Sequence, residues 1–213
     1  MNVMVLVAHA DDETLGAGGY IPQLVAQGHR ITCVIMSDGI LTVRGVKQDN
    51  RTDVYKAAKI LGIHEVHFLD YEDQKFDKYI LADLANSVFK LKIAPDFIIS
   101  HVDSDLNNDH KIVADIAKIV GRPKKKPITI LGCEIPNTTA WNGVPFHANY
   151  YVNIEKTLEK KIKAFSQYRN ELQKFPHPWS KEGLTVLAKM RGMESGCRLA
   201  EGFHVVRVAC SNG

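Results

Sequence analysis

Two clusters of imidazole and carboxylate side chains, in distant parts of the chain, contain the residue types from which metal sites are built. The first cluster is His9, Asp11 and Asp12, which follow the apolar residues 3–8 and precede a glycine-rich turn. Burying an imidazole and two carboxylates is costly unless a cation or a partner compensates them. A helix cap would use only one carboxylate. The cluster therefore indicates half of a metal site.

The second cluster lies within residues 100–110 and ends in His110. Together with His9 and Asp12, His110 can supply two nitrogens and one carboxylate oxygen. That donor set is typical of a catalytic zinc ion with its fourth position open for water, although Fe2+ or Co2+ would accept the same ligands. Asp11 then remains as a candidate general base for this water.

The elements that must position both clusters are predicted from short apolar runs that alternate with helical segments. The predicted strands are residues 3–8, 30–36, 66–69, 97–100 and 128–131. This alternation predicts an α/β fold with a doubly wound, mostly parallel Rossmann-like sheet. In such a sheet ligands bind at the carboxyl ends of the strands. Both clusters follow a predicted strand, so we expect them to meet at that edge.

Beyond Glu134 the alternation stops, and residues 135–213 are predicted to form a C-terminal capping part on the sheet core of residues 1–134. Earlier, residues 17–27 have helical spacing and end before Gly28. No internal repeat or low-complexity segment separates the two parts. We therefore expect a single domain over residues 1–213.

Composition narrows the class of protein and its partners. The chain has 213 residues, of which 45% are hydrophobic and 24% are charged, and its net charge is +3. So mild a charge gives no support for a nucleic-acid partner. The four cysteines form no C-x-x-C pair, and no apolar run has the length of a membrane span or the pattern of a signal peptide. We expect a cytoplasmic enzyme with a small-molecule substrate; the sequence does not indicate its oligomeric state.

The two clusters resemble the motifs of the zinc-dependent N-acetylglucosaminyl deacetylase family, of the PIG-L or LmbE-like type. The family's first motif, A-H-P-D-D-E, corresponds to residues 8–13, and its second, D-x-[HN]-x-D-H, corresponds to residues 105–110. Residues 134–142, 175–178 and 200–203 resemble a branch found among polysaccharide biosynthesis enzymes. Both motifs occur in the expected order, each after a suitable strand.

The resemblance implies an activity and the residues that perform it. His9, Asp12 and His110 would bind zinc, and Asp11 would be the general base. A zinc ion in such a site polarises an amide carbonyl and lowers the pKa of water to about 7. The implied reaction is the metal-dependent removal of an N-acyl group, expected to be acetyl, from an amino sugar or its conjugate.

On the substrate side, the resemblance implies sugar contacts from Arg51 and Asp73. Asn107 stands where many relatives carry a histidine that stabilises the oxyanion or donates a proton. An amide can donate a hydrogen bond but cannot titrate, so Asn107 either contacts the substrate or only holds its loop. The general acid would then be Asp11 alone or a histidine from elsewhere, such as His177.

Two more residues of the second cluster are expected near the ligands, and one alternative function stays open. Asp109 is expected to orient a ligating histidine, whereas His101 is either a neighbour of the ligands or a polar loop residue. The alternative to an enzyme is a non-catalytic sugar- or nucleotide-binding module on the same fold. Asp11 favours the enzyme, because a binding module has no use for a base beside a metal.

Overall fold

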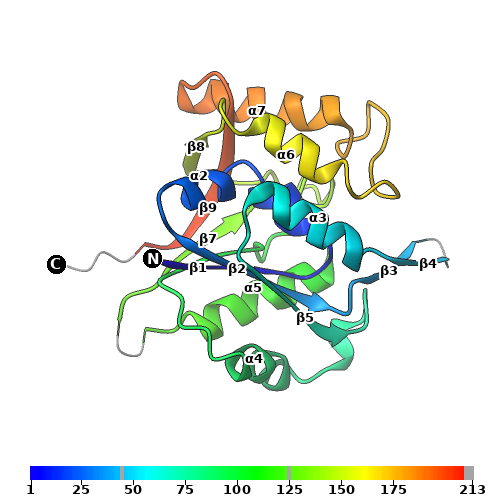
Figure 1. Ribbon diagram of the computed structural model, residues 1–213, viewed down its shortest axis with the longest axis vertical. Helices are drawn as coiled ribbons and strands as arrows, with labels where there is room; N and C mark the ends of the chain where they lie inside the picture. The colour runs from blue at the N-terminus through cyan, green and yellow to red at the C-terminus, as the bar shows by residue number, and fades with distance from the viewer. Residues whose placement is uncertain (44–45, 124–125, 209–213) are drawn as a thin grey trace.

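The computed structural model describes residues 1–43, 46–123 and 126–208. The strands in these ranges are β1 Asn2–Val7, β2 Arg30–Ser37, β3 Ile40–Val43, β4 Val46–Asp49, β5 Glu65–Tyr71, β6 Phe97–Ser100, β7 Thr129–Cys133, β8 Tyr150–Asn153 and β9 Ala200–Arg207. Seven of these described strands form one sheet in the order β5-β2-β1-β6-β7-β9-β8 (Figure 1). The first five in that order are parallel, and β9 is antiparallel to both β7 and β8. The predicted doubly wound, mostly parallel sheet is confirmed.

Helices cover both faces of this sheet. They are α1 Asp12–Ala17, α2 Ile21–Ala26, α3 Arg51–Leu61, α4 Leu81–Lys90, α5 Asn108–Val120, α6 Leu158–Phe165 and α7 Lys181–Ser195, with a 3-10 helix, η1, at Phe76–Lys78. In Figure 1, α4 and α5 lie on one side of the sheet, and α2, α3, α6 and α7 lie on the other. Over the described residues, none of the helices is long and apolar enough to cross a membrane.

Strand β1 is buried on both faces, which explains its unbroken apolar sequence. Val3, Val5 and Val7 pack into the core beneath α1, α2, α3, α6 and α7. Met4 and Leu6 point to the opposite core, beneath α4 and α5. Each of these five side chains is at most 1% exposed. Successive residues of a strand face opposite sides, so one central strand contributes to two cores.

The chain changes direction across the sheet beside β1. Strands β2 and β5 follow on one side of β1, and β6 and β7 follow on the other. Because the connections after β1 and β6 run in opposite directions, the carboxyl ends of these two strands leave a crevice between them, which is where open α/β sheets bind ligands. The two sequence clusters follow β1 and β6, and this topology brings them to the same crevice.

The C-terminal part of the chain extends the sheet as well as covering it. Strand β9 pairs with β7, and β8 pairs with β9. Helix α6 packs against α1 and α3, and α7 packs against α6 and β9. The boundary predicted at residue 134 stays a prediction; it adjoins the end of β7 at Cys133.

The helix predicted over residues 17–27 corresponds to α2, but α2 begins only at Ile21, and a distant carboxylate accounts for the non-helical residues between α1 and α2. The backbone N–H groups of Gly19 and Tyr20 each donate to Glu201 on β9, at 2.8 Å. Lys161 on α6 neutralises that carboxylate at 2.6 Å and also donates to the carbonyl oxygen of Leu15 at 2.7 Å. The predicted helix is therefore present but its predicted start was wrong, because a buried ion pair takes the backbone groups that residues 18–20 would use in a helix.

We expect the buried pair to be necessary for stability. Lys161→Met would leave Glu201 buried without its cation, which costs about 3–5 kcal/mol when one partner of a buried pair is removed. Lys160→Met is the matched control, because the neighbouring Lys160 is exposed. Denaturant unfolding of both variants measures the difference. Equal unfolding free energies would contradict a structural role for the Lys161–Glu201 pair.

Candidate metal centre

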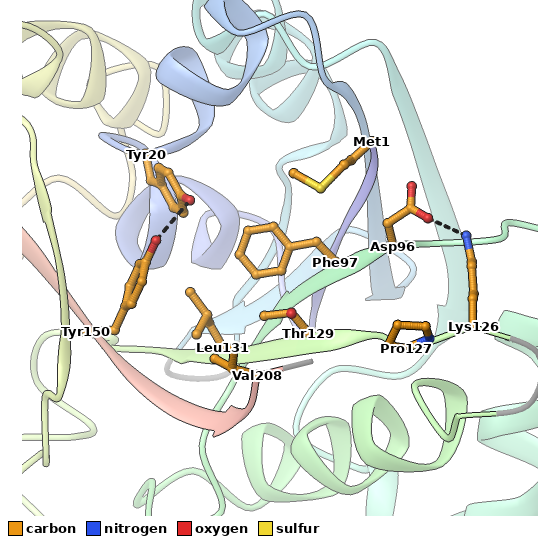
Figure 2. Close-up of a pocket in the computed structure, with 10 residues that line it drawn as sticks. All are labelled: Met1, Tyr20, Asp96, Phe97, Lys126, Pro127, Thr129, Leu131, Tyr150 and Val208. Atoms are coloured by element: carbon orange, nitrogen blue, oxygen red, sulfur yellow. Dashed lines mark hydrogen bonds and ion pairs between the residues drawn. The ribbon is translucent and has the colours of Figure 1, made fainter. Parts of the chain in front are cut away.

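Two of the cavities in the described part of the chain lie at opposite ends of the parallel strands, and one of these two has lining residues suited to metal chemistry. The cavity at the carboxyl edge, of about 340 Å³, is lined by His9, Asp11, Asp12, Leu41, Asp73, Gln74, Asn107, His110, Thr138, Glu171 and Trp179. The other, of about 400 Å³, lies beside the first residues of β1, β6 and β7 (Figure 2). Its charged lining residues in the described chain, Asp96 and Lys126, pair with each other at 2.5 Å. The carboxyl-edge cavity is therefore the candidate site.

Three donor atoms form a nearly equilateral triangle at one wall of this cavity. His9 Nδ1 and His110 Nε2 are 3.3 Å apart, and each lies 3.4 Å from Asp12 Oδ2. Ligand atoms about 2.0–2.1 Å from a tetrahedral zinc ion are themselves about 3.3–3.4 Å apart. The donor set therefore fits a zinc-sized ion in both residue type and spacing.

A second carboxylate lies behind each histidine and determines which ring nitrogen faces the centre. Asp109 Oδ2 is 3.1 Å from His9 Nε2, and because a carboxylate can only accept, Nε2 carries the proton. Asp109 is itself held, since its Oδ1 accepts from the backbone N–H of Phe76 at 3.0 Å. Asp105 Oδ2 lies 3.1 Å from His110 Nδ1. Each ring is thus oriented with its other nitrogen toward Asp12, as in metal sites with carboxylate-supported histidines.

Other groups of acidic and histidine residues overlap this triangle but are less accessible. His9, Asp73 and Asp109 form one such group, and His101, Asp105 and His110 form another. Of the three groups, only His9, Asp12 and His110 have every member in the lining of the cavity. An ion held by His9, Asp12 and His110 would therefore be accessible to a substrate in the cavity.

Without a bound ion, His9 and His110 favour their protonated form. Burial alone would lower the pKa of His9, but its hydrogen bonds to Asp109 and Asp12 raise it to about 10. Burial is likewise outweighed at His110, whose pKa is raised by Asp12 and Asp105. Burial would raise the pKa of Asp12, yet His110 and His101 lower it well below its usual range. A cation in the triangle would replace protons that already occupy it.

Asp11 occupies an unusual backbone conformation that its neighbour Glu13 stabilises. Its φ of 111° lies in the left-handed region, which is strained for any residue other than glycine. The Glu13 carboxylate accepts from the backbone N–H of Asp11 at 3.1 Å and from the hydroxyl of Tyr168 at 2.6 Å. This turn directs the carboxylates of Asp11 and Asp12 to different positions around the cavity.

The Asp11 carboxylate is buried, only 3% of the residue being exposed, and its Oδ2 has no hydrogen-bond partner within the described ranges. Burial, and next the charge of Asp12, raise its pKa well above the usual value. A buried oxygen without a partner is uncommon in native proteins and indicates a missing ligand, water or ion. Asp11 can therefore accept a proton from a molecule in the cavity.

Asn107 both caps a helix and lines the cavity. Its Oδ1 accepts from the backbone N–H of Asp109 at 2.9 Å, which caps α5, and its Nδ2 donates to Gln74 Oε1 at 3.3 Å. His101 lies behind the ligands instead. Its Nε2 accepts from the backbone N–H of Ala8 at 3.0 Å, and its ring stacks on that of His110 at 4.0 Å.

The remaining predicted residues lie at different distances from the centre. Asp73 lines the cavity, with its Oδ1 3.2 Å from His9 Nε2. Arg51 and His177 do not belong to the described lining. Arg51 is exposed and pairs with Asp49 at 2.5 Å. His177 contacts two indole rings edge to face, and its Nδ1 accepts from the backbone N–H of Trp179 at 3.0 Å. The functional roles of these three residues stay predictions.

Sequence reasoning missed several residues of the site. The first motif includes Glu13, but its spacing assigned that residue no role. Glu171 and Trp179 line the cavity from the C-terminal part of the chain. Neither stands in a motif of metal-binding residues, so no local signal in the sequence could have identified them.

The chain is similar to known proteins over most of its length. Residues 4–120 match the family described as PIG-L, GlcNAc-PI de-N-acetylase. The chain is similar to diacetylchitobiose deacetylase of Thermococcus kodakarensis, at 22% identity over 96% of this chain and 82% of the relative. It is also similar to 4-oxalmesaconate hydratase of Pseudomonas putida, at 27% identity over 91% of this chain and 81% of the relative.

The fold has solved counterparts as well. N,N'-diacetylchitobiose deacetylase from Pyrococcus horikoshii, in complex with its inhibitor MPG, superposes with a TM-score of 0.76. The two chains are 21% identical, and the match covers 96% of this chain and 83% of the other. At that identity the likeness establishes the fold.

The ligand assignment predicts that His110→Ala loses the ion. The substitution removes one of three protein ligands, so we expect a divalent ion to bind at least about tenfold more weakly, the lower end of losses caused even by mutating a ligand's supporting residue. Metal analysis and calorimetric titration measure this loss. His147→Ala is the control, because His147 is exposed and outside the cavity. A His110→Ala variant with stoichiometric metal at unchanged affinity would refute the assignment.

The raised pKa of His9 predicts a pH dependence of metal binding. Below about pH 10 the metal-free His9 is protonated, so an ion must displace that proton and binds more weakly as the pH falls. For one displaced proton the affinity should drop about tenfold per pH unit. Calorimetry at pH 7 in buffers of different ionisation enthalpy counts the released protons. Binding without proton release, and with equal affinity at pH 6 and pH 8, would contradict the protonated state.

Proposed function

The chain belongs to the PIG-L family of de-N-acetylases, and on that basis we propose that it removes the acetyl group from an N-acetyl amino sugar or its conjugate in a metal-dependent reaction. The observation that carries the proposal is the triangle of His9 Nδ1, Asp12 Oδ2 and His110 Nε2 beside the buried Asp11, at the wall of one cavity. A binding module would need neither the open metal position nor the unpartnered carboxylate.

His9, Asp12 and His110 are the residues that would hold the ion, and two nitrogens with one carboxylate oxygen at this spacing support zinc. When bound, the ion supplies Lewis-acid activation of the amide carbonyl and of the attacking water. Asp105 and Asp109 contribute by fixing the orientation of the two imidazoles. Their negative charges also favour a cation at the centre.

Asp11 would take the proton that the attacking water loses as its oxygen bonds to the acetyl carbon. The same proton would then pass to the departing nitrogen as the C–N bond breaks, so that a neutral amine and acetic acid form, and the acid ionises to acetate by giving its proton to solvent. The raised pKa of Asp11 in its buried position suits a group that must hold a proton between these steps. Asn107 can donate a hydrogen bond but not a proton, so Asp11 serves as both base and acid.

A second reaction type has support from one relative. The hydratase from Pseudomonas putida is similar over most of this chain, and a base with an activated water can also add water to a double bond. Its substrate is an organic acid anion, whereas neither lysine nor arginine is found in the described lining of this cavity. The charge of the site therefore favours an N-acetyl sugar over such an anion.

Finer assignments extend the proposal. We assign zinc as the native ion because of the donor set, and polysaccharide biosynthesis as the context because three C-terminal segments resemble that branch. We also propose that the substrate is a small molecule, that the protein does not bind nucleic acid, and that it is located in the cytoplasm. Metal analysis of the purified protein, followed by a screen of N-acyl sugars for release of a primary amine, tests the activity directly.

The role of Asp11 predicts a specific loss. Asp11→Asn is nearly isosteric but cannot accept a proton, so kcat should fall by about 10²–10⁴-fold while metal content and substrate affinity change little. The exposed Asp83 on α4 provides the control substitution, Asp83→Asn, which should retain full activity. Steady-state kinetics on an N-acetyl sugar measures both variants. A near wild-type kcat for Asp11→Asn would exclude Asp11 as the base.

A further inference from the structure

The cavity beside the metal triangle has an unbalanced charge. Four carboxylates line it, from Asp11, Asp12, Asp73 and Glu171, and none of its described lining residues is a lysine or an arginine. With every carboxylate ionised, a divalent ion held by His9, Asp12 and His110 would offset two of these four negative charges. Because Coulomb interactions are strong in a partly desolvated cavity, a negatively charged substrate would meet net repulsion there.

Of this group, Glu171 is the carboxylate to which neither the family resemblance nor the proposed reaction assigns a role. It belongs to the turn after α6, where its backbone N–H donates to the carbonyl oxygen of Tyr168 at 3.0 Å. Tyr168 is fixed in turn by its hydroxyl bond to Glu13. Glu171 is therefore attached, through Tyr168, to the same turn that carries Asp11.

The Glu171 side chain has an acceptor that the protein satisfies only in part. The residue is 5% exposed, and its Oε1 makes no hydrogen bond of good geometry in the described part of the chain, although the Asn50 side chain lies close enough to stabilise the carboxylate. Burying a carboxylate oxygen without a partner is costly. Since Glu171 lines the cavity, a hydrogen-bond donor on a bound ligand would remove that cost.

An aromatic side chain lies in the same cavity wall. Trp179 lines the cavity, and its indole N–H donates to the carbonyl oxygen of Pro136 at 2.5 Å, which fixes the ring. An aromatic surface with a few fixed polar groups is typical of a small-molecule site. Thr138, Gln74 and Asn107 add uncharged polar groups to the lining. The combination suits a ligand with hydroxyl groups and an apolar ring face.

We propose that the cavity selects an uncharged N-acetylated glycoside over one that carries a phosphate, and that Glu171 makes this selection by accepting a hydrogen bond from a sugar hydroxyl. The carboxylate attracts a hydroxyl donor and repels a phosphate at the same position. This inference rests on the proposed function, because it concerns the substrate of the same site.

The test compares two matched substrates, methyl N-acetyl-α-glucosaminide and N-acetyl-α-glucosamine 1-phosphate, with the zinc-loaded protein. We expect kcat/KM to be at least about tenfold higher for the methyl glycoside, the factor that corresponds to about 1.4 kcal/mol. Glu171→Gln keeps an acceptor but removes the charge, so this ratio should shrink several-fold, mainly through better use of the phosphate. Glu159→Gln removes an exposed carboxylate on α6 and should leave the ratio unchanged.

A binding measurement separates this inference from the proposed function. Calorimetric titration of zinc-loaded Asp11→Asn with both sugars, with and without Glu171→Gln, reports selection in the absence of turnover. Preference for the methyl glycoside that is weakened by Glu171→Gln supports the inference, even if the wild type releases no amine and the proposed function fails. Equal or tighter binding of the phosphate, a ratio unaffected by Glu171→Gln, or no binding of either sugar would overturn it.

Discussion

A single carboxylate, that of Asp12, lies between two imidazoles that the chain delivers from opposite sides of the crevice beside β1. Behind His9 lies Asp109, and behind His110 lies Asp105, so carboxylates and imidazoles alternate through the buried centre. Buried ionisable groups persist only when they are paired. Each pair also determines which nitrogen of the imidazole faces Asp12. The contacts that balance the buried charges therefore also fix the orientation of the candidate ligands.

The strained turn at Asp11 makes the site depend on the C-terminal part of the chain. Glu13 stabilises the turn through the backbone of Asp11, and Tyr168 reaches Glu13 from the segment after α6. Helix α6 is anchored in turn by Lys161, which forms an ion pair with Glu201. The same Glu201 carboxylate binds the backbone after α1, where the helical conformation stops. The sheet brings the ligands together, whereas these contacts across the layers hold the base beside them.

At Asn107 one amide serves both the fold and the cavity. Its oxygen caps α5, the helix that carries His110, and its nitrogen donates to Gln74 in the cavity wall. A histidine at this position would add a titrating group to the cavity. The asparagine leaves it with an uncharged donor, so acid–base chemistry is concentrated on the carboxylates. The excess of negative charge then distinguishes this cavity from one built to receive phosphates.

The sequence by itself determined the parallel sheet and indicated the three residues that the structure brings together as a possible metal site, because both depend largely on local information. Apolar runs identify buried strands, His9 and Asp12 share one turn, and His110 opens the helix after β6. Only the tertiary structure decided that Glu201 binds the backbone after α1 and that Glu171 enters the cavity. These contacts join residues far apart in the chain, and whether a distant carboxylate reaches a backbone amide or a cavity depends on how the layers pack. Neither periodicity nor motif spacing records that packing.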